Sequence, residues 1–205
     1  MKNIDIKRSN RKKNNSLDLK TLTVSQIEAE LNREKESFKY FKILRSTIYA
    51  LIIVAAVATL IATLMMPVLK ISGSSMVPTF REGEIVVSFK TKNLQTGDVI
   101  AFYHGNKILV KRVIAGAGQW VNIDLDGNVT VDGELLDEAY VEELSLGDND
   151  VEFPYQVPDG CWFVLGDRRS ISMDSRNAEI GSISQDEVVG KILFRVWPLR
   201  RFGTI

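Results

Sequence analysis

"IYALIIVAAVATLIATLMMPVL", residues 48–69, contains no charged side chain and only two threonines. As an α-helix this segment spans about 30 Å, which is the thickness of the hydrocarbon core of a bilayer. A buried core helix of this length should show a polar face, and a cleaved signal peptide would have a shorter apolar region close to the N-terminus. We therefore predict one transmembrane helix, residues 46–69, that divides the chain in two.

The charges differ on the two sides of this segment. Residues 1–45 hold twelve Lys or Arg against six Asp or Glu, and the rest of the chain holds fourteen against twenty. Lys39, Lys42 and Arg45 precede the helix, whereas only Lys70 follows it closely. Because basic flanks stay in the cytoplasm, we predict a single-pass protein of the cell membrane. Residues 1–45 are then a cytoplasmic basic arm, and residues 70–205 are extracytoplasmic.

The basic run "RSNRKKNN", residues 8–15, is the most polar part of the arm. Nucleic-acid binding is not expected, because no aromatic platform or folded reader accompanies the run. A solvated tail that is attracted to anionic lipid is the better interpretation, so membrane lipid is a predicted partner.

Beyond the membrane segment the pattern changes to β. Short runs rich in branched and aromatic residues alternate with turn signals such as "TGD", "HGN" and "VPDG". The acidic stretch 137–150 is expected to be an exposed loop. We predict an all-β, mostly antiparallel domain over residues 70–205, with strands at 84–89, 98–103, 108–115, 120–125, 128–133, 161–167 and 190–198.

Adjacent serines at the start of this domain, in "ISGSSMVPTF" (71–80), raise the possibility of a hydrolase, which needs a base. His104, the one histidine in the sequence, is predicted to lie at a hairpin tip, so a Ser-His-Asp triad is not expected. Lys111 is the alternative, because the alternation of a strand places Leu109 and Val113 on its face. Apolar neighbours desolvate an amine and lower its pKa. A surface lysine on an edge strand remains the other interpretation.

A third stretch, "LGDRRSISMDSRNAEIG" (165–181), is dense in acids, arginines and serines directly after an apolar strand. Such a composition is typical of a solvated loop. It also suits a polar shell that fixes a catalytic amine. From this pattern alone both interpretations stay open.

Together these stretches resemble the type I signal peptidases of bacteria. "GSSMVPT" (73–79) is similar to the serine box of that family, "GDVIAF" (97–102) to the next segment and "KRVIAGAGQ" (111–119) to its lysine box. "VDGELLDEAY" (131–140) is similar to the connecting region, and "GDRRSISMDSR" (166–176) to the final Gly-Asp box. The resemblance runs in order from the membrane segment to about residue 197, and it favours the compact Gram-positive type.

The resemblance implies a fold, a reaction and site residues. It implies a signal-peptidase-like β domain that removes signal peptides from secreted preproteins as a monomer, without cofactor or metal. Ser75 would be the nucleophile and Lys111 its general base in an acyl-enzyme mechanism. Supporting roles fall to Ser172, Asp174, Arg176 and Asp167. Cleavage after small-x-small motifs implies shallow apolar pockets, for which the matching positions are Leu69, Ile71, Met76, Leu109 and Val110.

Two positions depart from the family pattern. Some members use a serine two positions before the nucleophile as a second oxyanion donor, and here that position is Gly73. Arg168 replaces the usual asparagine after Gly-Asp. Two other functions fit the sequence less well. The self-cleaving repressors are Ser-Lys enzymes of the cytosol, which a membrane anchor argues against. Inactive pilus-assembly homologues lack the serine or the lysine, and this chain has both.

Overall fold

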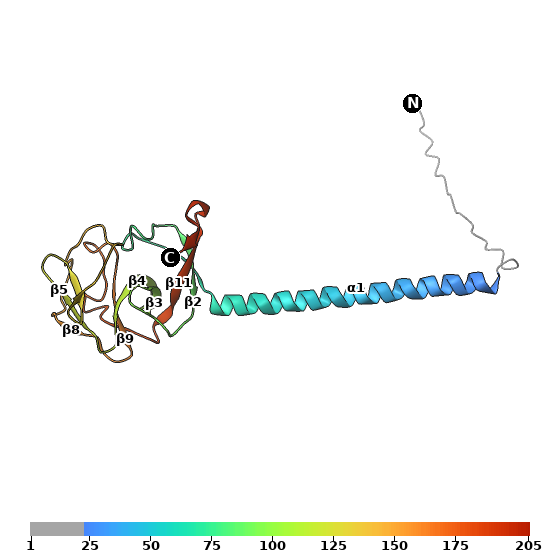
Figure 1. Ribbon diagram of the computed structural model, residues 1–205, viewed down its shortest axis with the longest axis horizontal. Coiled ribbons are helices and arrows are strands. Elements are labelled where there is room, and N and C mark those ends of the chain that lie inside the picture. The colour runs from blue at the N-terminus through green and yellow to red at the C-terminus, as the bar shows by residue number, and fades with distance from the viewer. Residues whose placement is uncertain (1–22) are drawn as a thin grey trace, which may run out of the picture. The chain divides into compact units, whose positions relative to one another are not determined.

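A computed structural model describes residues 23–205, so the basic run at 8–15 lies outside the described residues. The chain divides after Val57 into two units, which are described separately. Helix α1 (Val24–Met65) begins in the first unit and ends in the second (Figure 1). Within α1, Lys39–Met65 is long and apolar enough to cross a membrane, by length and composition, and its apolar window has no buried residue.

The helix ends four residues earlier than predicted. It stops at Met65, and Val68–Lys70 forms strand β1, so residues 66–69 of the predicted transmembrane helix are not helical. Pro67 explains the early end, because proline disfavours helical conformation in the residue before it. The carbonyl of Pro67 instead accepts hydrogen bonds from the backbone N–H and hydroxyl of Ser88. The β domain therefore starts at Val68 and not at residue 70.

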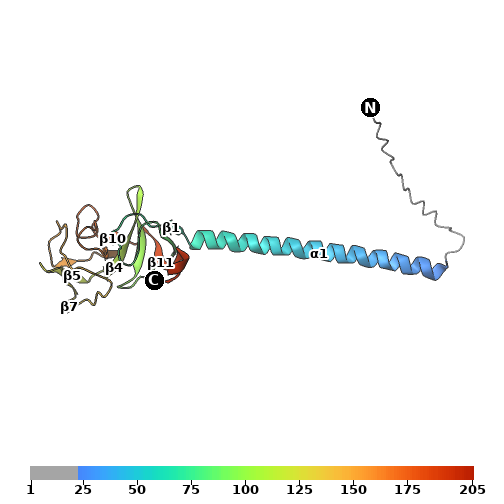
Figure 2. The same ribbon diagram turned by 90° about the horizontal axis from the view of Figure 1, so that it is seen from above.

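The second unit contains two antiparallel sheets (Figures 1 and 2). The larger one has the order β1–β2–β11–β3–β4–β9–β10, with β12 paired to β11. Its further strands are β2 (Ile85–Phe89), β3 (Val99–His104), β4 (Lys107–Gly116), β9 (Cys161–Leu165), β10 (Ile183–Ser184), β11 (Val188–Trp197) and β12 (Gly203–Thr204). The smaller sheet has the order β7–β6–β5–β8, with β5 (Trp120–Ile123), β6 (Val129–Val131), β7 (Glu134–Leu135) and β8 (Tyr155–Gln156).

The predicted all-β, antiparallel domain is confirmed. Each of the seven predicted strands is present, and His104 pairs with Lys107 across the tight β3–β4 turn, as predicted for a hairpin tip. The missed elements are the short strands β1, β7, β8, β10 and β12 and the 3-10 helix η1 (Leu199–Arg201). Strands of two or three residues are too short to show an alternating pattern.

Three apolar clusters fill the domain, and one of them lies beneath the serine-rich segment. Ile71, Met76 and Phe80 pack there against Val86 and Val99, together with Ile192 of β11. The chain between β1 and β2 is therefore held by its own buried side chains. This packing fixes the backbone on which Ser75 is carried.

The acidic stretch 137–150 is not simply an exposed loop, which corrects the prediction. Glu138 pairs with Arg169, whose side chain is almost completely buried. The ring of Tyr140 lies under the guanidinium of Arg112, 3.9 Å from ring centroid to Cζ. A buried arginine needs such partners, because an unpaired charge is costly to remove from water.

Candidate active site

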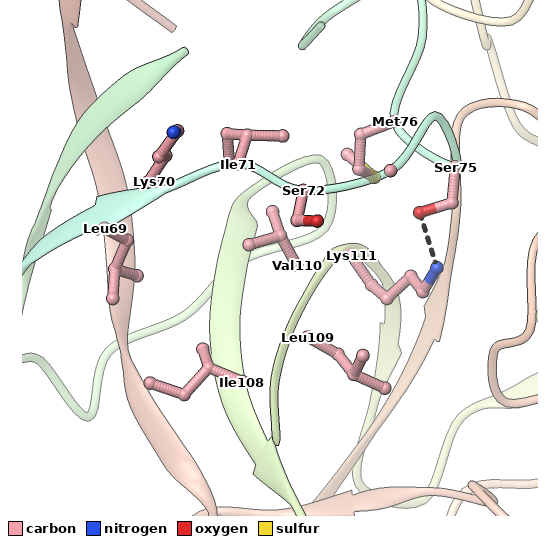
Figure 3. Close-up of a pocket in the computed structure, with 11 residues that line it drawn as sticks. Leu69, Lys70, Ile71, Ser72, Ser75, Met76, Ile108, Leu109, Val110 and Lys111 are labelled. Atoms are coloured by element: carbon pink, nitrogen blue, oxygen red, sulfur yellow. Dashed lines mark hydrogen bonds between the residues drawn. The ribbon is translucent and has the colours of Figure 1, made fainter. Parts of the chain in front are cut away.

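Ser75 and Lys111 come from different parts of the fold and meet side chain to side chain. Ser75 lies in the turn after β1, and Lys111 lies in the middle of β4. The Lys111 Nζ is 2.9 Å from the Ser75 Oγ (Figure 3). This is hydrogen-bond distance, within which an amine without its extra proton can accept from a serine hydroxyl.

Burial makes the neutral form of Lys111 accessible. The residue is 3% exposed. Loss of water around the amine lowers its pKa from the ordinary 10.5 to about 8. The negative charge of Asp174 opposes this shift, and the positive charge of Arg176 partly cancels that opposition. The apolar neighbours inferred from strand alternation therefore have the expected electrostatic effect.

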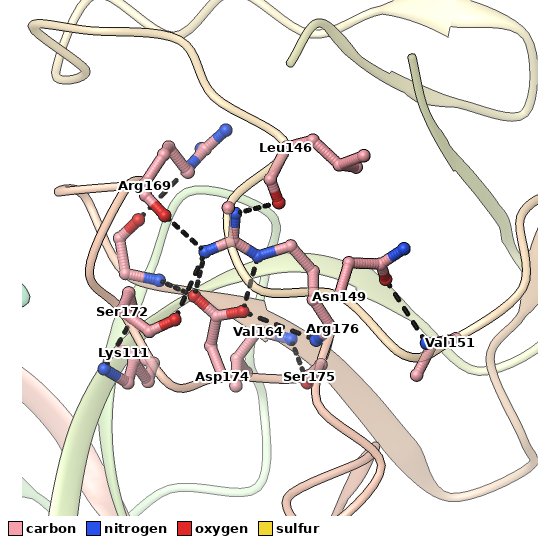
Figure 4. A network of polar contacts seen from close by, with 12 residues as sticks. Lys111, Leu146, Asn149, Val151, Val164, Arg169, Ser172, Asp174, Ser175 and Arg176 are labelled. Carbon is pink, nitrogen blue, oxygen red and sulfur yellow. Dashed lines mark hydrogen bonds and ion pairs between the residues drawn. The ribbon is translucent and has the colours of Figure 1, made fainter. Parts of the chain in front are cut away.

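Ser172 lies on the other side of the amine. Its Oγ is also 2.9 Å from Lys111 Nζ, so two hydroxyls hold the direction of the amine (Figure 4). Gly166 leaves room for this arrangement. A Cβ on Gly166 would lie 2.1 Å from Ser172 Oγ and 2.7 Å from the Ser75 carbonyl oxygen. Position 166 therefore requires a glycine, because Ser172 and Ser75 pack too closely against it for a side chain.

Asp174 and Arg176 form a fully buried ion pair below Ser172. Arg176 Nε and Nη2 lie 2.8 Å from the two carboxylate oxygens of Asp174 (Figure 4). Asp174 also accepts from the backbone N–H of Gly166, and Arg176 donates to the carbonyls of Leu146 and Arg169. The stretch is consequently a buried polar network rather than a solvated loop.

Arg112 is a site residue that the sequence analysis did not select. It follows Lys111 in β4, and its guanidinium makes two hydrogen bonds to Asp167, of 2.9 and 2.7 Å. It also donates to the Gly97 carbonyl and to Thr79 Oγ1. Its position one residue after Lys111 does not indicate a role in the site, because an arginine at this position of a strand could equally be a surface residue.

A cavity of about 220 Å³ adjoins Ser75 and Lys111. It is smaller than drug-sized sites, which begin at roughly 300 Å³. Ile71 and Met76 are almost entirely buried, so only small parts of them reach it. The cavity is also lined by four residues that were not predicted as pocket residues: Lys70, Ser72, Gly73 and Ile108. All five predicted pocket residues line it: Leu69, Ile71, Met76, Leu109 and Val110 (Figure 3).

The two positions that depart from the family pattern, Gly73 and Arg168, both lie close to Ser75. Gly73 has a φ of +84°, in the left-handed region that side-chain-bearing residues rarely adopt. A serine there would be strained, so this backbone does not suit a second hydroxyl donor. The side chain of Arg168 is exposed, and its backbone N–H donates to the Ser75 carbonyl at 2.9 Å. The contact is a backbone one and does not depend on an asparagine side chain.

A serine hydroxyl that lies 2.9 Å from a buried lysine amine is the arrangement found in Ser-Lys acyl-transfer enzymes. Comparison with known proteins identifies the family. Residues 44–197 match the family described as signal peptidase, peptidase S26. Signal peptidase IB of Staphylococcus aureus (strain COL) is 38% identical over 154 residues, covering 64% of this chain and 78% of the relative. Signal peptidase I of Bacillus caldolyticus is 34% identical over 150 residues, covering 65% and 80%.

A crystal structure of a signal peptidase I from Enterococcus faecalis V583 is 29% identical, covers 50% of this chain and 98% of that chain, and has a TM-score of 0.41. The family match extends over most of the chain and includes both Ser75 and Lys111. The chain therefore belongs to the signal peptidase family, peptidase S26, and is a serine peptidase. The predicted family is confirmed.

Proposed function

We propose that this protein is a membrane-anchored endopeptidase that removes N-terminal signal peptides from secreted preproteins, with Ser75 as nucleophile and Lys111 as general base. The observation that carries the proposal is the 2.9 Å contact between Ser75 Oγ and the buried Lys111 amine. A pKa of about 8 leaves a useful fraction of this amine neutral near pH 7.

In the acylation step, the lone pair of neutral Lys111 accepts the proton of the Ser75 hydroxyl as Oγ attacks the scissile carbonyl carbon. The carbonyl oxygen becomes negatively charged, and the backbone N–H of Ser75 is the proposed donor that stabilises it. The C–N bond then breaks. Lys111 gives its new proton to the leaving amine, which is the N-terminus of the mature protein. The signal peptide remains bound to Ser75 as an ester.

Hydrolysis of the ester uses the same groups in reverse. Lys111, neutral again, accepts a proton from a water molecule as the water oxygen attacks the ester carbonyl. The bond to Ser75 Oγ breaks, and Lys111 returns the proton to that oxygen. A hydrogen bond from the amine to Ser172 Oγ keeps the lone pair directed at the reacting atoms in both steps.

The cavity supports cleavage after small-x-small motifs. Its apolar lining residues Leu69, Ile71, Met76, Leu109 and Val110 are available to contact alanine-like side chains next to the scissile bond. Larger side chains would have to displace Ile71 or Met76, which belong to the core cluster under the loop. Displacing well-packed core residues costs roughly 1–3 kcal/mol, which would disfavour a substrate with a larger side chain about 10–100-fold.

The proposed location of the enzyme follows from α1 and the charges beside it. A single membrane crossing over Lys39–Met65 would keep the basic arm in the cytoplasm and the β domain outside. There the domain meets preproteins whose signal peptides still lie in the membrane. Membrane lipid is thus a proposed partner, and the enzyme is proposed to act as a monomer, without cofactor or metal.

The test is cleavage of a peptide with a small-x-small signal sequence by the full chain in detergent. Ser75→Ala and Lys111→Ala should each remove nearly all turnover while the thermal unfolding of the β domain is unchanged. The double variant should be little worse than either single variant, because members of one catalytic unit are not additive. Full activity of a folded Lys111→Ala protein would disprove the proposed base. Ser74→Ala, at the neighbouring hydroxyl, is the matched control and should stay active.

A further inference from the structure

The loop that carries Ser75 is closed at its base. Ile71 N–H donates to the Glu84 carbonyl at 2.8 Å, and Gly83 N–H donates to the Ile71 carbonyl at 2.9 Å. Inside the loop, Phe80 N–H donates to the Met76 carbonyl at 2.7 Å. This last bond joins the far part of the loop to the residue next to Ser75. A movement of residues 79 and 80 would therefore move the backbone next to the nucleophile.

Three arginines meet at Thr79, four residues after Ser75. Arg112 Nη2 donates to Thr79 Oγ1 at 3.1 Å, and Arg195 Nη2 donates to the Thr79 carbonyl at 2.7 Å. Arg201 Nη2 lies 3.4 Å from the same carbonyl. Arg112 belongs to the strand of Lys111, whereas Arg195 and Arg201 come from the end of the chain. Thr79 thus links the strand of the base to the C-terminal segment.

Glu84 holds the two C-terminal arginines together. Its side chain is almost fully buried; Oε2 lies 3.0 Å from Arg195 Nε and Oε1 lies 2.5 Å from Arg201 Nη1. The Arg195 contact is at ion-pair distance without the alignment of a hydrogen bond. Arg195 Cζ also lies 5.2 Å from the ring centroid of Phe80, whose side chain is fully buried. Two guanidinium groups share one carboxylate, and the Nη2 atom of each donates to a loop carbonyl.

We propose that Glu84, Arg195 and Arg201 form a C-terminal clamp that keeps Ser75 at hydrogen-bond distance from Lys111. The three are positioning residues, since they act through Thr79 and Phe80. Arg201 lies four residues beyond the segment 44–197 that matches the family. The inference rests on the proposed function of Ser75 and Lys111. A displacement of about 1 Å between two such reacting groups lowers the catalytic rate roughly 100-fold.

The experiment compares Arg201→Ala and Glu84→Gln with wild type as full chains in detergent, using one small-x-small peptide. We expect kcat, per folded molecule, to fall roughly 10–100-fold while KM changes less than about twofold. Arg200→Ala is the matched control, because Arg200 is an exposed neighbour in η1 and should keep wild-type kcat. Arg201→Lys should retain only part of the rate, since an ammonium cannot reach Glu84 and the loop carbonyls together.

The outcomes separate this inference from the proposed function. A purely structural role would lower the unfolding temperature but leave kcat per folded molecule unchanged, and that result would overturn the clamp. If Arg201→Ala does not fold, wild-type kcat in folded Arg201→Lys would overturn it equally. Cleavage by Ser75→Ala would instead disprove the dyad itself. An inactive Ser75→Ala together with fully active Glu84→Gln and Arg201→Ala would reject the clamp alone.

Discussion

The carboxylate of Asp174 is turned toward Arg176 and not toward the Lys111 amine. Both oxygens of Asp174 lie 2.8 Å from nitrogens of Arg176, and one also accepts from Gly166 N–H. The negative charge of Asp174 still raises the pKa of Lys111, but Arg176 offsets part of this effect and the loss of water around the amine outweighs it. The buried pair therefore fixes the loop of Ser172, while burial keeps the pKa of Lys111 low.

The first prediction concerns the pH dependence of cleavage. Lys111 must be neutral to accept a proton, and its pKa of about 8 places that change well below the ordinary 10.5. The value of kcat/KM should rise about tenfold between pH 7 and pH 9 and then level off. A pH–rate profile on one soluble peptide measures this directly. A limb that continues to rise up to pH 10.5 would contradict the desolvation of Lys111.

A second prediction concerns the buried ion pair. Arg176→Met leaves the Asp174 charge buried without its partner, which should cost about 3–5 kcal/mol in the free energy of unfolding. The unpaired carboxylate should also raise the pKa of Lys111 and move the rising limb to higher pH. Urea unfolding and the pH–rate profile measure the two effects. Asp174→Leu with Arg176→Met removes both charges and should recover much of the stability; equal losses in the single and double variants would refute this account.

The third prediction concerns Gly166. Gly166→Ala places a methyl group where Ser172 Oγ and the Ser75 carbonyl now lie, so one of them must move away. We expect kcat to fall roughly 100-fold, as for other displacements of about 1 Å at a reacting centre. Ser172→Ala should also lower kcat, because the amine loses its second partner. Gly203→Ala is the control, since Gly203 has open space around it and an ordinary φ. Wild-type kcat in Gly166→Ala would show that the close packing is not needed.

Membrane orientation is the subject of the fourth prediction. If the basic flank of α1 stays in the cytoplasm, protease added outside intact protoplasts should digest residues 75–205 and spare the segment before Arg45. Antibodies to tags at the two ends would follow the fragments. Detergent-permeabilised cells, in which both ends should be digested, are the control. Protection of the C-terminal tag in intact protoplasts would reverse the orientation.

Strand alternation predicted apolar neighbours for Lys111, and the resemblance of the short motifs to a known family implied Ser75, Ser172, Asp174 and Arg176. The structure brings Ser75 and Ser172 to the Lys111 amine and pairs Asp174 with Arg176. Glu84, Arg195 and Arg201 were not found, because their contacts join residues more than 100 positions apart. Charged residues with such distant partners look the same in sequence as solvated ones. The same holds for Glu138, whose side chain pairs with the buried Arg169 although the rest of its loop is half-buried or exposed.

Strand β11 separates two groups of strands that have no other connection within the larger sheet. On one side are β1 and β2, between which Ser75 lies; on the other are β3, β4 and β9, with Lys111 on β4. Because β11 follows both residues in the sequence, a growing chain contains Ser75 and Lys111 before the sheet that joins their strands can be completed. The sheet can therefore bring the proposed nucleophile to the proposed base only after β11 has been synthesised.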